Sequence, residues 1–147
     1  MNILVSRCLL GEPCRYDGAS RPVEGLRRLE QEGHTLIPVC PEVEGGLPTP
    51  RPPAELQKDG RVVNRLGADV TQQYRAGAEC ALELARIHNC TVAVLKEKSP
   101  SCGGAQVYDG TFTGTLIPGQ GVTAQLLSRH GIRVLGESEL DKLSEDG

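Results

Sequence analysis

The chain has 147 residues, of which 38% are hydrophobic, and these values predict a single domain with one core over residues 1–147. The formal net charge is −3 and no run of lysines or arginines occurs, which argues against duplex DNA or RNA as a partner. With no Trp, one Phe and three Tyr, the chain also has few aromatic platforms for single-stranded bases, so a small-molecule substrate is favoured.

Residues 1–6 form only a short apolar run, without the long hydrophobic region and small-residue cleavage site of a secretory signal. No stretch approaches the length of a membrane span. We therefore expect a cytoplasmic protein without a membrane partner. In that compartment its six cysteines are free thiols or metal ligands rather than disulfides.

The first half of the chain predicts two strands and a helix. Residues 2–6 are apolar and end in a Gly/Pro-containing loop, which is typical of a buried strand. Apolar residues at helical spacing follow over 23–32, with Gly33 as a stop, and a second strand is predicted over 35–39. The proline-rich segment 41–53 predicts a loop rather than a helix or a central strand.

The next segments predict a long helix, a strand and a hairpin. Asp69 can cap a helix that runs to about residue 88, because apolar and small residues recur on one face. The clearest strand covers 91–95. Residues 106–116 have the pattern of a hairpin that turns at Asp109-Gly110.

A short helix over 123–129 and a strand over 132–135 complete the predicted elements. Strands therefore alternate with helices along the chain, with loops between some of them. This order predicts a small parallel α/β sandwich.

Three cysteines follow three predicted strands. Cys8 lies two residues past the first strand, Cys40 immediately past the second and Cys102 a few residues past the third. Ligands of parallel sheets collect beyond the carboxyl ends of the strands. We therefore expect these three thiols to share one edge of the sheet.

The other three cysteines have different positions. Cys90 lies at the opposite end of the third strand and is expected to be a bystander. Cys80 is expected to be a buried residue of the long helix. Cys14 lies in a loop that can either bring it near Cys8 or leave it in structural packing.

Three converging thiolates are compatible with more than one site. A structural zinc site normally has four ligands with paired C-x2-C spacing, which is not present. A 4Fe-4S cluster tolerates ligands scattered along the chain, and three thiolates leave one iron open to substrate, which suggests catalysis. Spacing alone leaves open whether the three cysteines share a ligand.

Four segments occur together: CLLGEPCRYDG, PVCPEVEGGLPTPR, LKEKSPSCGG and YDGTFTG-LIPGQGVTAQLL. They are similar, in the same order and over nearly the whole chain, to signature blocks of the bacterial thiouracil desulfidase family (domain of unknown function 523). The resemblance implies one iron-sulfur-binding, Rossmann-like α/β domain, a three-layer sandwich with a mostly parallel sheet. It implies a 4Fe-4S cluster bound by Cys8, Cys40 and Cys102, and conversion of thiouracil-type thionucleobases into uracil and hydrosulfide without net redox change.

This implied chemistry needs a carboxylate near the cluster. An open iron polarises the C=S bond, and water attacks the ring carbon. Glu42, two residues from Cys40, is the first candidate to position or deprotonate that water. The alternative is that Glu42 only pairs with an arginine or caps backbone amides. Glu44 is a substitute candidate and a possible substrate contact.

Two serines, Ser99 and Ser101, flank Pro100 just before Cys102. Ser101, next to Cys102, is a candidate to donate or relay a proton at the substrate, and Ser99 is a candidate substrate contact that can do the same. Both hydroxyls can instead satisfy loop amides.

Polar residues of two other loops are also candidates. Asp17 is expected to read the polar edge of a pyrimidine, whereas Arg15 is expected to form a bridge to Asp17. Arg51 is expected to hold the proline-rich loop through carbonyl oxygens. None of the three histidines is assigned to a metal.

Three functional hypotheses follow. The first is a 4Fe-4S-dependent desulfidase that acts on a thiolated nucleobase. The second is an iron-sulfur or other metal-binding sensor or interaction module without turnover. The third is a metal-free cysteine hydrolase with Cys40 or Cys102 as the nucleophile, and the lack of a histidine near either loop in the sequence counts against it.

Overall fold

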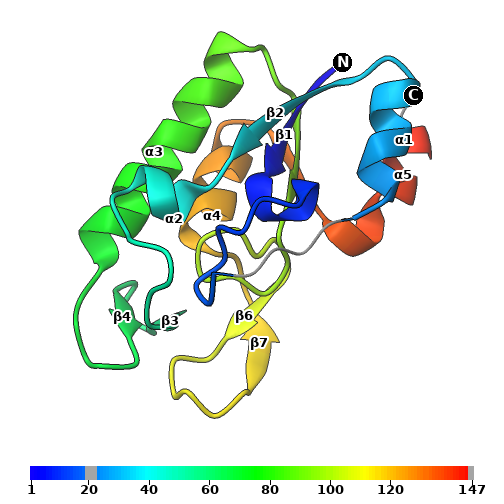
Figure 1. Ribbon diagram of the computed structural model, residues 1–147. Helices are drawn as coiled ribbons and strands as arrows, with labels where there is room; N and C mark the ends of the chain where they lie inside the picture. The colour runs from blue at the N-terminus through cyan, green and yellow to red at the C-terminus, as the bar shows by residue number, and fades with distance from the viewer. Residues whose placement is uncertain (19–22, 146–147) are drawn as a thin grey trace.

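The computed structural model describes residues 1–18 and 23–145. Its centre is a four-stranded sheet with helices on both faces, and two small β-ribbons lie beyond one end of the sheet (Figure 1). All neighbouring strands in this sheet are parallel. The strands occur in the order β2 (Thr35–Val39), β1 (Asn2–Ser6), β5 (Val92–Leu95) and β8 (Arg133–Gly136). The predicted parallel α/β fold and its four strands are thereby confirmed.

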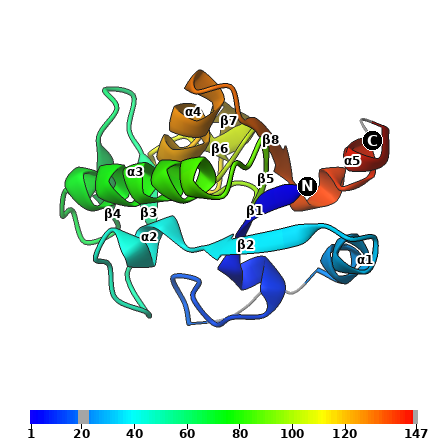
Figure 2. The same cartoon turned by 90° about the horizontal axis from the view of Figure 1, so that it is seen from above.

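Two core clusters, one on each face of the sheet, give the fold three layers (Figure 2). One face packs against helices α1 (Gly25–Gln31) and α5 (Asp141–Glu145), and the other against α3 (Thr71–Ile87) and α4 (Val122–Arg129). Successive side chains of a strand point to opposite faces. In β1, accordingly, Ile3 and Val5 belong to the first cluster and Leu4 to the second.

The segment 41–53 does not begin as a loop, contrary to the prediction. Residues Pro41–Glu44 form a short helix, α2, with Cys40 at its N-cap in extended conformation. Proline is favoured at the first position of a helix, because the N–H that it lacks has no intrahelical partner there and its φ is already helical. Pro41 therefore starts the helix that follows β2.

The hairpin prediction was correct in type and wrong in its turn. Strand β6 (Gln106–Tyr108) pairs in antiparallel fashion with β7 (Leu116–Pro118), and residues 109–115 form the connection instead of a tight turn at 109–110. A second ribbon, β3 (Ala54–Leu56) with β4 (Val62–Asn64), was not predicted. Strands of three residues are too short to show a period of two.

Two residues at or within the long helix α3 differ slightly from the predictions. Asp69 Oδ1 accepts the N–H of Thr71 at 2.9 Å, although Val70 occupies the N-cap position of α3. Cys80 is only half-buried, and its Sγ lies 4.0 Å from Glu44 Oε2, so it is not the buried helix residue that was expected.

Among the described residues, no helix is long and apolar enough to cross a membrane.

Two glycines let α2 lie directly on α3. A Cβ added to Gly77 of α3 would lie 1.8 Å from the Pro41 carbonyl oxygen, and one added to Gly45 would lie 1.9 Å from the Gln73 carbonyl oxygen. Only glycine permits such backbone-to-backbone approach. The position of α2, and of the cysteine at its N-cap, therefore depends on this contact.

We expect Gly77→Ala to lower the free energy of unfolding by about 3 kcal/mol, because the added methyl group overlaps the backbone of α2. Urea unfolding followed by circular dichroism measures this change. Ala76→Gly, at the exposed neighbouring position, is the matched control and should cost about 1 kcal/mol through helix propensity alone. A Gly77→Ala protein as stable as the wild type would show that α2 does not need this contact.

Candidate functional site

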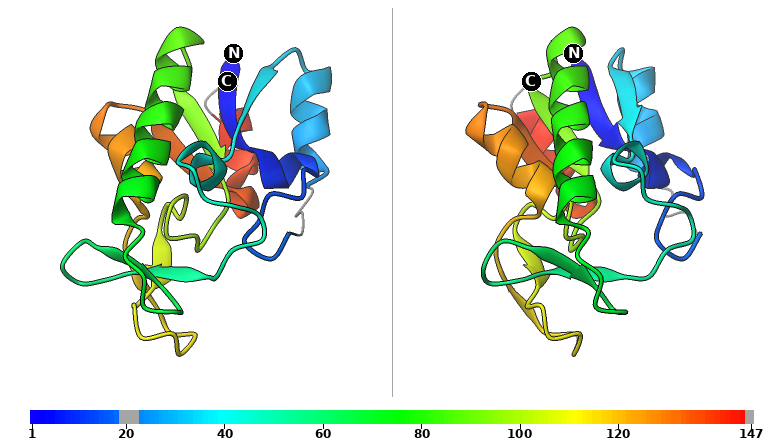
Figure 3. Two further views of the ribbon diagram at one scale, coloured as in Figure 1. Left: turned by 60° about the vertical axis from the view of Figure 1, so that its left-hand side comes forward. Right: turned by 90° about the vertical axis from the view of Figure 1, so that its left-hand side faces the viewer.

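A cleft of about 630 Å³ lies where the central strands end. Its walls come from the segments after β1, β2 and β5, from the first turn of α2, and from the two ribbons that project beyond this edge (Figure 3). Loops at the carboxyl ends of parallel strands are the usual place for ligand sites in such folds. The cleft is therefore the candidate site of this protein.

Four cysteines line this cleft, and each is at least 93% buried. Cys8 lies in the 3-10 helix that follows β1, Cys40 is the N-cap of α2, and Cys102 lies in the turn after β5. The structure thus brings together the three cysteines that strand topology placed at one edge. Cys90, at the other end of β5, does not line the cleft.

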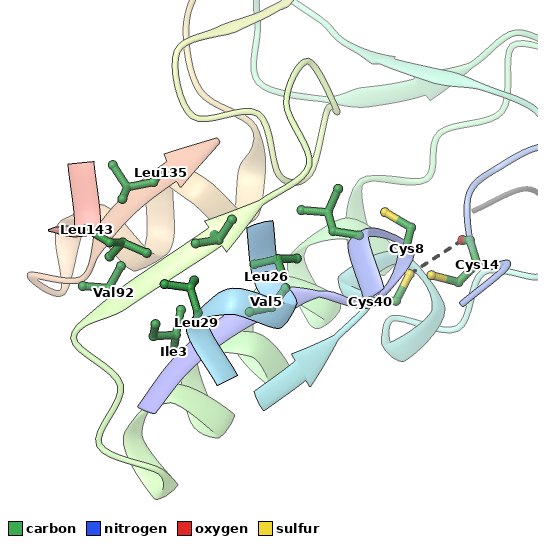
Figure 4. Packing of buried hydrophobic residues seen from close by; sticks show 12 residues of the cluster. Ile3, Val5, Cys8, Cys14, Leu26, Leu29, Cys40, Val92, Leu135 and Leu143 are labelled. Atoms are coloured by element: carbon green, nitrogen blue, oxygen red, sulfur yellow. Dashed lines mark hydrogen bonds between the residues drawn. The ribbon is translucent and has the colours of Figure 1, made fainter. Parts of the chain in front are cut away.

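Cys14 is the fourth cysteine of the cleft, which the sequence left undecided. Its thiol hydrogen-bonds with the thiols of both Cys8 and Cys40. The Cys40 Sγ also lies 3.8 Å from the Cys14 carbonyl oxygen (Figure 4). Cys14 therefore links the thiols of Cys8 and Cys40, and Cys102 lines the same cleft.

These thiols have altered acidities. The hydrogen bond with Cys14, in which the Cys40 thiol is the donor, followed by burial, raises the pKa of Cys40 far above its usual value. Burial first, and then the charge of Glu42, raise the pKa of Cys102 to about 12. A hydrogen bond with Cys40 lowers the pKa of Cys14, but the hydrogen bond with Cys8 and burial outweigh it. Without a cation these thiols stay protonated at neutral pH, and metal binding must displace their protons.

The donor set fits a polynuclear metal group better than a single ion. Among the described residues, no three His, Cys, Asp or Glu side chains gather closely enough to hold one metal ion. A single zinc ion needs every ligand within about 2.0–2.3 Å of one point, whereas an iron-sulfur cluster takes one thiolate at each of several irons. Thiols that line different walls of one cleft satisfy the second requirement.

The charge of the cleft wall also suits an anionic group. Among the described residues the basic side chains outnumber the acidic ones, although the whole chain is acidic. A cluster bound by thiolates carries negative charge, which nearby cations stabilise. The basic side chains are Arg7, Arg15, Arg51, Arg65, Lys96 and Lys98, and the acidic ones are Glu42, Glu55 and Glu97.

Glu42 lines the cleft and is held by a buried ion pair with Arg51. Arg51 Nε and Nη2 donate to Glu42 Oε2 at 3.1 and 2.8 Å, and the two side chains are only 4% and 14% exposed. The Tyr74 hydroxyl of α3 donates to the same oxygen at 3.2 Å. Burial, and then the charge of Glu42, raise the pKa of that phenol, so Tyr74 remains a donor. Both predicted alternatives for Glu42, a place in the site and an arginine partner, are present.

Arg51 also has the loop role that was predicted. Its Nη1 donates to the Pro48 carbonyl and the Thr49 hydroxyl, and its Nη2 to the Cys14 carbonyl, each at 3.2 Å. One buried guanidinium therefore joins the proline-rich segment, the Cys14 loop and Glu42.

The two serines near Cys102 have different positions. Ser99 lines the cleft, accepts the N–H groups of Ser101 and Cys102 at 3.1 Å each, and donates to Glu42 Oε1 at 3.3 Å. Ser101 is fully buried, with its hydroxyl 2.7 Å from that of Thr123, and does not line the cleft. A hydrogen bond with this hydroxyl lowers the pKa of the Cys102 thiol, although burial and the charge of Glu42 outweigh it. The structure thus brings Ser99, and not Ser101, to the cleft.

Glu44 and Asp17 are not among the described residues that line the cleft. The Glu44 carboxylate lies 3.5 Å from Nη1 of Arg7, which does line the cleft. Asp17 is exposed, and its neighbours Arg15 and Tyr16 line the wall instead. The three histidines, all described, lie elsewhere too, so a histidine-assisted cysteine hydrolase is not favoured.

Several cleft residues were not predicted from the sequence. Tyr74 lies on the inward face of α3, where a buried phenol needs a hydrogen-bond partner. Lys98 and Phe112 both have positive φ, 67° and 59°, which sequence alone does not reveal in residues of these types. Positive φ at bulky side chains is a feature of functional loops.

Comparisons with known proteins agree on one family. Residues 3–139 match the family model described as 2-thiouracil desulfurase. The chain is 43% identical over 150 residues to "Uncharacterized protein YbbK" of Bacillus subtilis (strain 168), covering 96% of this chain and 99% of that protein. It is also similar to the solved structure of the 4Fe-4S-dependent thiouracil desulfidase TudS, with 48% identity, a TM-score of 0.93, and coverage of 99% of this chain and 96% of that one.

We expect Arg51→Met to lower the free energy of unfolding by about 3 kcal/mol, because the change leaves the Glu42 carboxylate buried without its cation. Chemical denaturation of the metal-free protein measures the loss. The double variant Arg51→Met/Glu42→Gln removes the stranded charge and should recover part of the stability. Glu42→Gln alone lowers the free energy of unfolding of the wild type by some amount. If the same change lowers the free energy of unfolding of Arg51→Met by that full amount, the two residues are not coupled.

Proposed function

Since the chain belongs to the 2-thiouracil desulfurase family, we propose that it removes sulfur from thiouracil-type thionucleobases and releases uracil and hydrosulfide without net redox change. The observation that carries this proposal is the meeting of three strand-end cysteines with Glu42 on one cleft. The cleft is large enough for a pyrimidine ring beside a metal group.

A 4Fe-4S cluster held by Cys8, Cys40 and Cys102 is the proposed cofactor. Support comes from the three separate strand ends that supply these cysteines, from the basic cleft wall, and from the similarity to TudS, a 4Fe-4S-dependent thiouracil desulfidase. When bound through three thiolates, such a cluster supplies one iron without a protein ligand, a Lewis acid for a thiocarbonyl sulfur. Residues 1–147 then act as a single iron-sulfur-binding domain.

Glu42 is the proposed general base toward the water that replaces sulfur on the ring carbon. Its Oε2 accepts three hydrogen bonds, from Arg51 Nε, Arg51 Nη2 and the Tyr74 hydroxyl, which fix the carboxylate and occupy that oxygen. Its Oε1 accepts a longer bond from Ser99, at 3.3 Å. The water proton is therefore taken at Oε1, on the side of the cysteine-bearing turn after β5.

Ser99 is the proposed positioning residue for the base Glu42. Its hydroxyl donates to Glu42 Oε1 while two amide N–H groups are donated to its oxygen, so its position is fixed and its proton points toward the base. Ser101 is a positioning residue in this scheme, because its buried hydroxyl supports Cys102 and Thr123. Substrate contacts by Glu44 and Asp17 form no part of the proposal.

The cluster assignment is tested by iron and acid-labile sulfide analysis of protein purified without oxygen. We expect about four irons per chain, lost in Cys8→Ala, Cys40→Ala and Cys102→Ala. Cys80→Ala and Cys90→Ala, outside the cleft, are the controls and should keep them, as should Cys14→Ala. A wild-type protein that stays free of iron after reconstitution would refute the proposed function, and iron loss only in Cys14→Ala would refute the choice of ligands.

The role of Glu42 is tested by turnover of 2-thiouracil, followed as loss of its ultraviolet absorbance. We expect Glu42→Gln to lower kcat by a factor of about 10² to 10⁴ while iron content is unchanged, because the amide cannot take a proton. Glu44→Gln is the matched control, two residues along the same short helix and not in the cleft lining, and should keep kcat within about twofold. Wild-type turnover by Glu42→Gln would assign the base to another residue.

A further inference from the structure

The chain's one phenylalanine lies on the cleft wall in an unusual backbone conformation. Phe112 is part of the connection 109–115, is half-buried and lines the cleft. Its φ is 59°, in the left-handed region that bulky side chains rarely adopt. Residues in such conformations persist only where surrounding contacts hold them, and they concentrate at functional sites.

The contacts that hold Phe112 come from the other ribbon. Glu55 of β3 accepts the N–H groups of Gly110 and Phe112 on one carboxylate oxygen, Oε1, at 3.0 and 3.1 Å. Glu55 is 9% exposed, and it also lines the cleft. The Gln57 side chain donates to the Gly110 carbonyl at 3.3 Å. A carboxylate that receives two N–H groups is a strong anchor, so the connection is fixed to β3.

The connection is also braced internally. Asp109 Oδ1 accepts the N–H of Thr111 at 3.0 Å. The hydroxyls of Thr111, Thr113 and Thr115 form a chain with separations of 2.7 and 2.9 Å. The loop that carries Phe112 is therefore held from outside by Glu55 and from within by its own hydroxyls.

Resting on the proposed function, we propose that Phe112 packs its ring against the planar ring of the substrate, and that Glu55 is the positioning residue that holds Phe112 there. An aromatic face attracts any nucleobase ring without reading its polar edge. Phe112 thus contributes affinity for a flat heterocycle, while the polar groups of the cleft supply the chemistry.

Phe112→Gly separates this role from a structural one. Glycine adopts positive φ without strain, so the variant should melt no lower than the wild type while KM for 2-thiouracil rises about tenfold or more and kcat changes less than about threefold. Phe112→Tyr should restore KM. Asn89→Gly, at a positive-φ position outside the cleft, is the matched control and should leave KM unchanged.

A second set of variants tests the part played by Glu55. Glu55→Ala should raise KM in the same direction as Phe112→Gly, and Glu55→Gln, which keeps an acceptor oxygen, should raise it less. The double variant Glu55→Ala/Phe112→Gly should have the KM of Phe112→Gly alone, because Glu55 acts through Phe112. Additive changes in KM would overturn the positioning role of Glu55.

Uracil binding to the iron-loaded protein, measured by saturation-transfer NMR, distinguishes this inference from the proposed function. We expect uracil to bind the wild type and to bind Phe112→Gly about tenfold more weakly. If the wild type turns over 2-thiouracil and Phe112→Gly has unchanged KM and uracil affinity, the inference is wrong and the function stands. If the wild type binds uracil in a Phe112-dependent way without turnover, the function is wrong and the inference stands. Absence of both binding and turnover in the wild type overturns both.

Discussion

The candidate site depends on the buried guanidinium of Arg51. Its donors reach Glu42, the Cys14 carbonyl and two residues of its own proline-rich segment, while its backbone N–H donates to the Tyr16 carbonyl at 2.7 Å. Arginine can serve all these acceptors at once because its planar fork has five N–H donors in fixed directions. The proline-rich segment, the Cys14 loop and helix α2 are thereby fixed relative to one another around the thiols.

Helix α3 supplies the rigid support for this arrangement. Its glycine contact with α2 sets the position of Cys40, and its Tyr74 hydroxyl reaches the same Glu42 oxygen as Arg51. Tyr74 also belongs to the third core cluster with Val62 and Val70, which connects the site to the β3–β4 ribbon. The carboxylate is thus oriented by one helix and one loop, so the geometry of Glu42 does not rely on a single flexible segment.

The local pattern of apolar residues in the sequence was enough to predict the sheet and the edge at which the cysteines meet. The β1 and β2 segments are continuous apolar runs, and the topology of parallel strands then places Cys8, Cys40 and Cys102 together. Partners that are distant in sequence were beyond such reasoning. Glu42 hydrogen-bonds with Tyr74, which is 32 positions away in the sequence. The Ser6 hydroxyl accepts the N–H of Lys96 and lies 3.6 Å from the Sγ of Cys102, which is 96 positions away. The β3–β4 ribbon, with strands of three residues, gave no periodic signal either, and it carries Glu55. The pattern of 106–116 predicted a hairpin but not the connection 109–115 that carries Phe112.

The acidity of the thiols connects cofactor loading to the structure of the cleft. Burial and thiol neighbours raise the pKa values of Cys40 and Cys102, so both are protonated at neutral pH until a cation replaces the proton. Each iron-bound thiolate adds negative charge to a dry region, where it needs compensation. The excess of basic side chains around the cleft, in a chain whose formal charge is −3, supplies that compensation. An acidic protein can in this way hold several thiolates together, because six of its 16 lysine and arginine side chains line the cleft where the thiolates form.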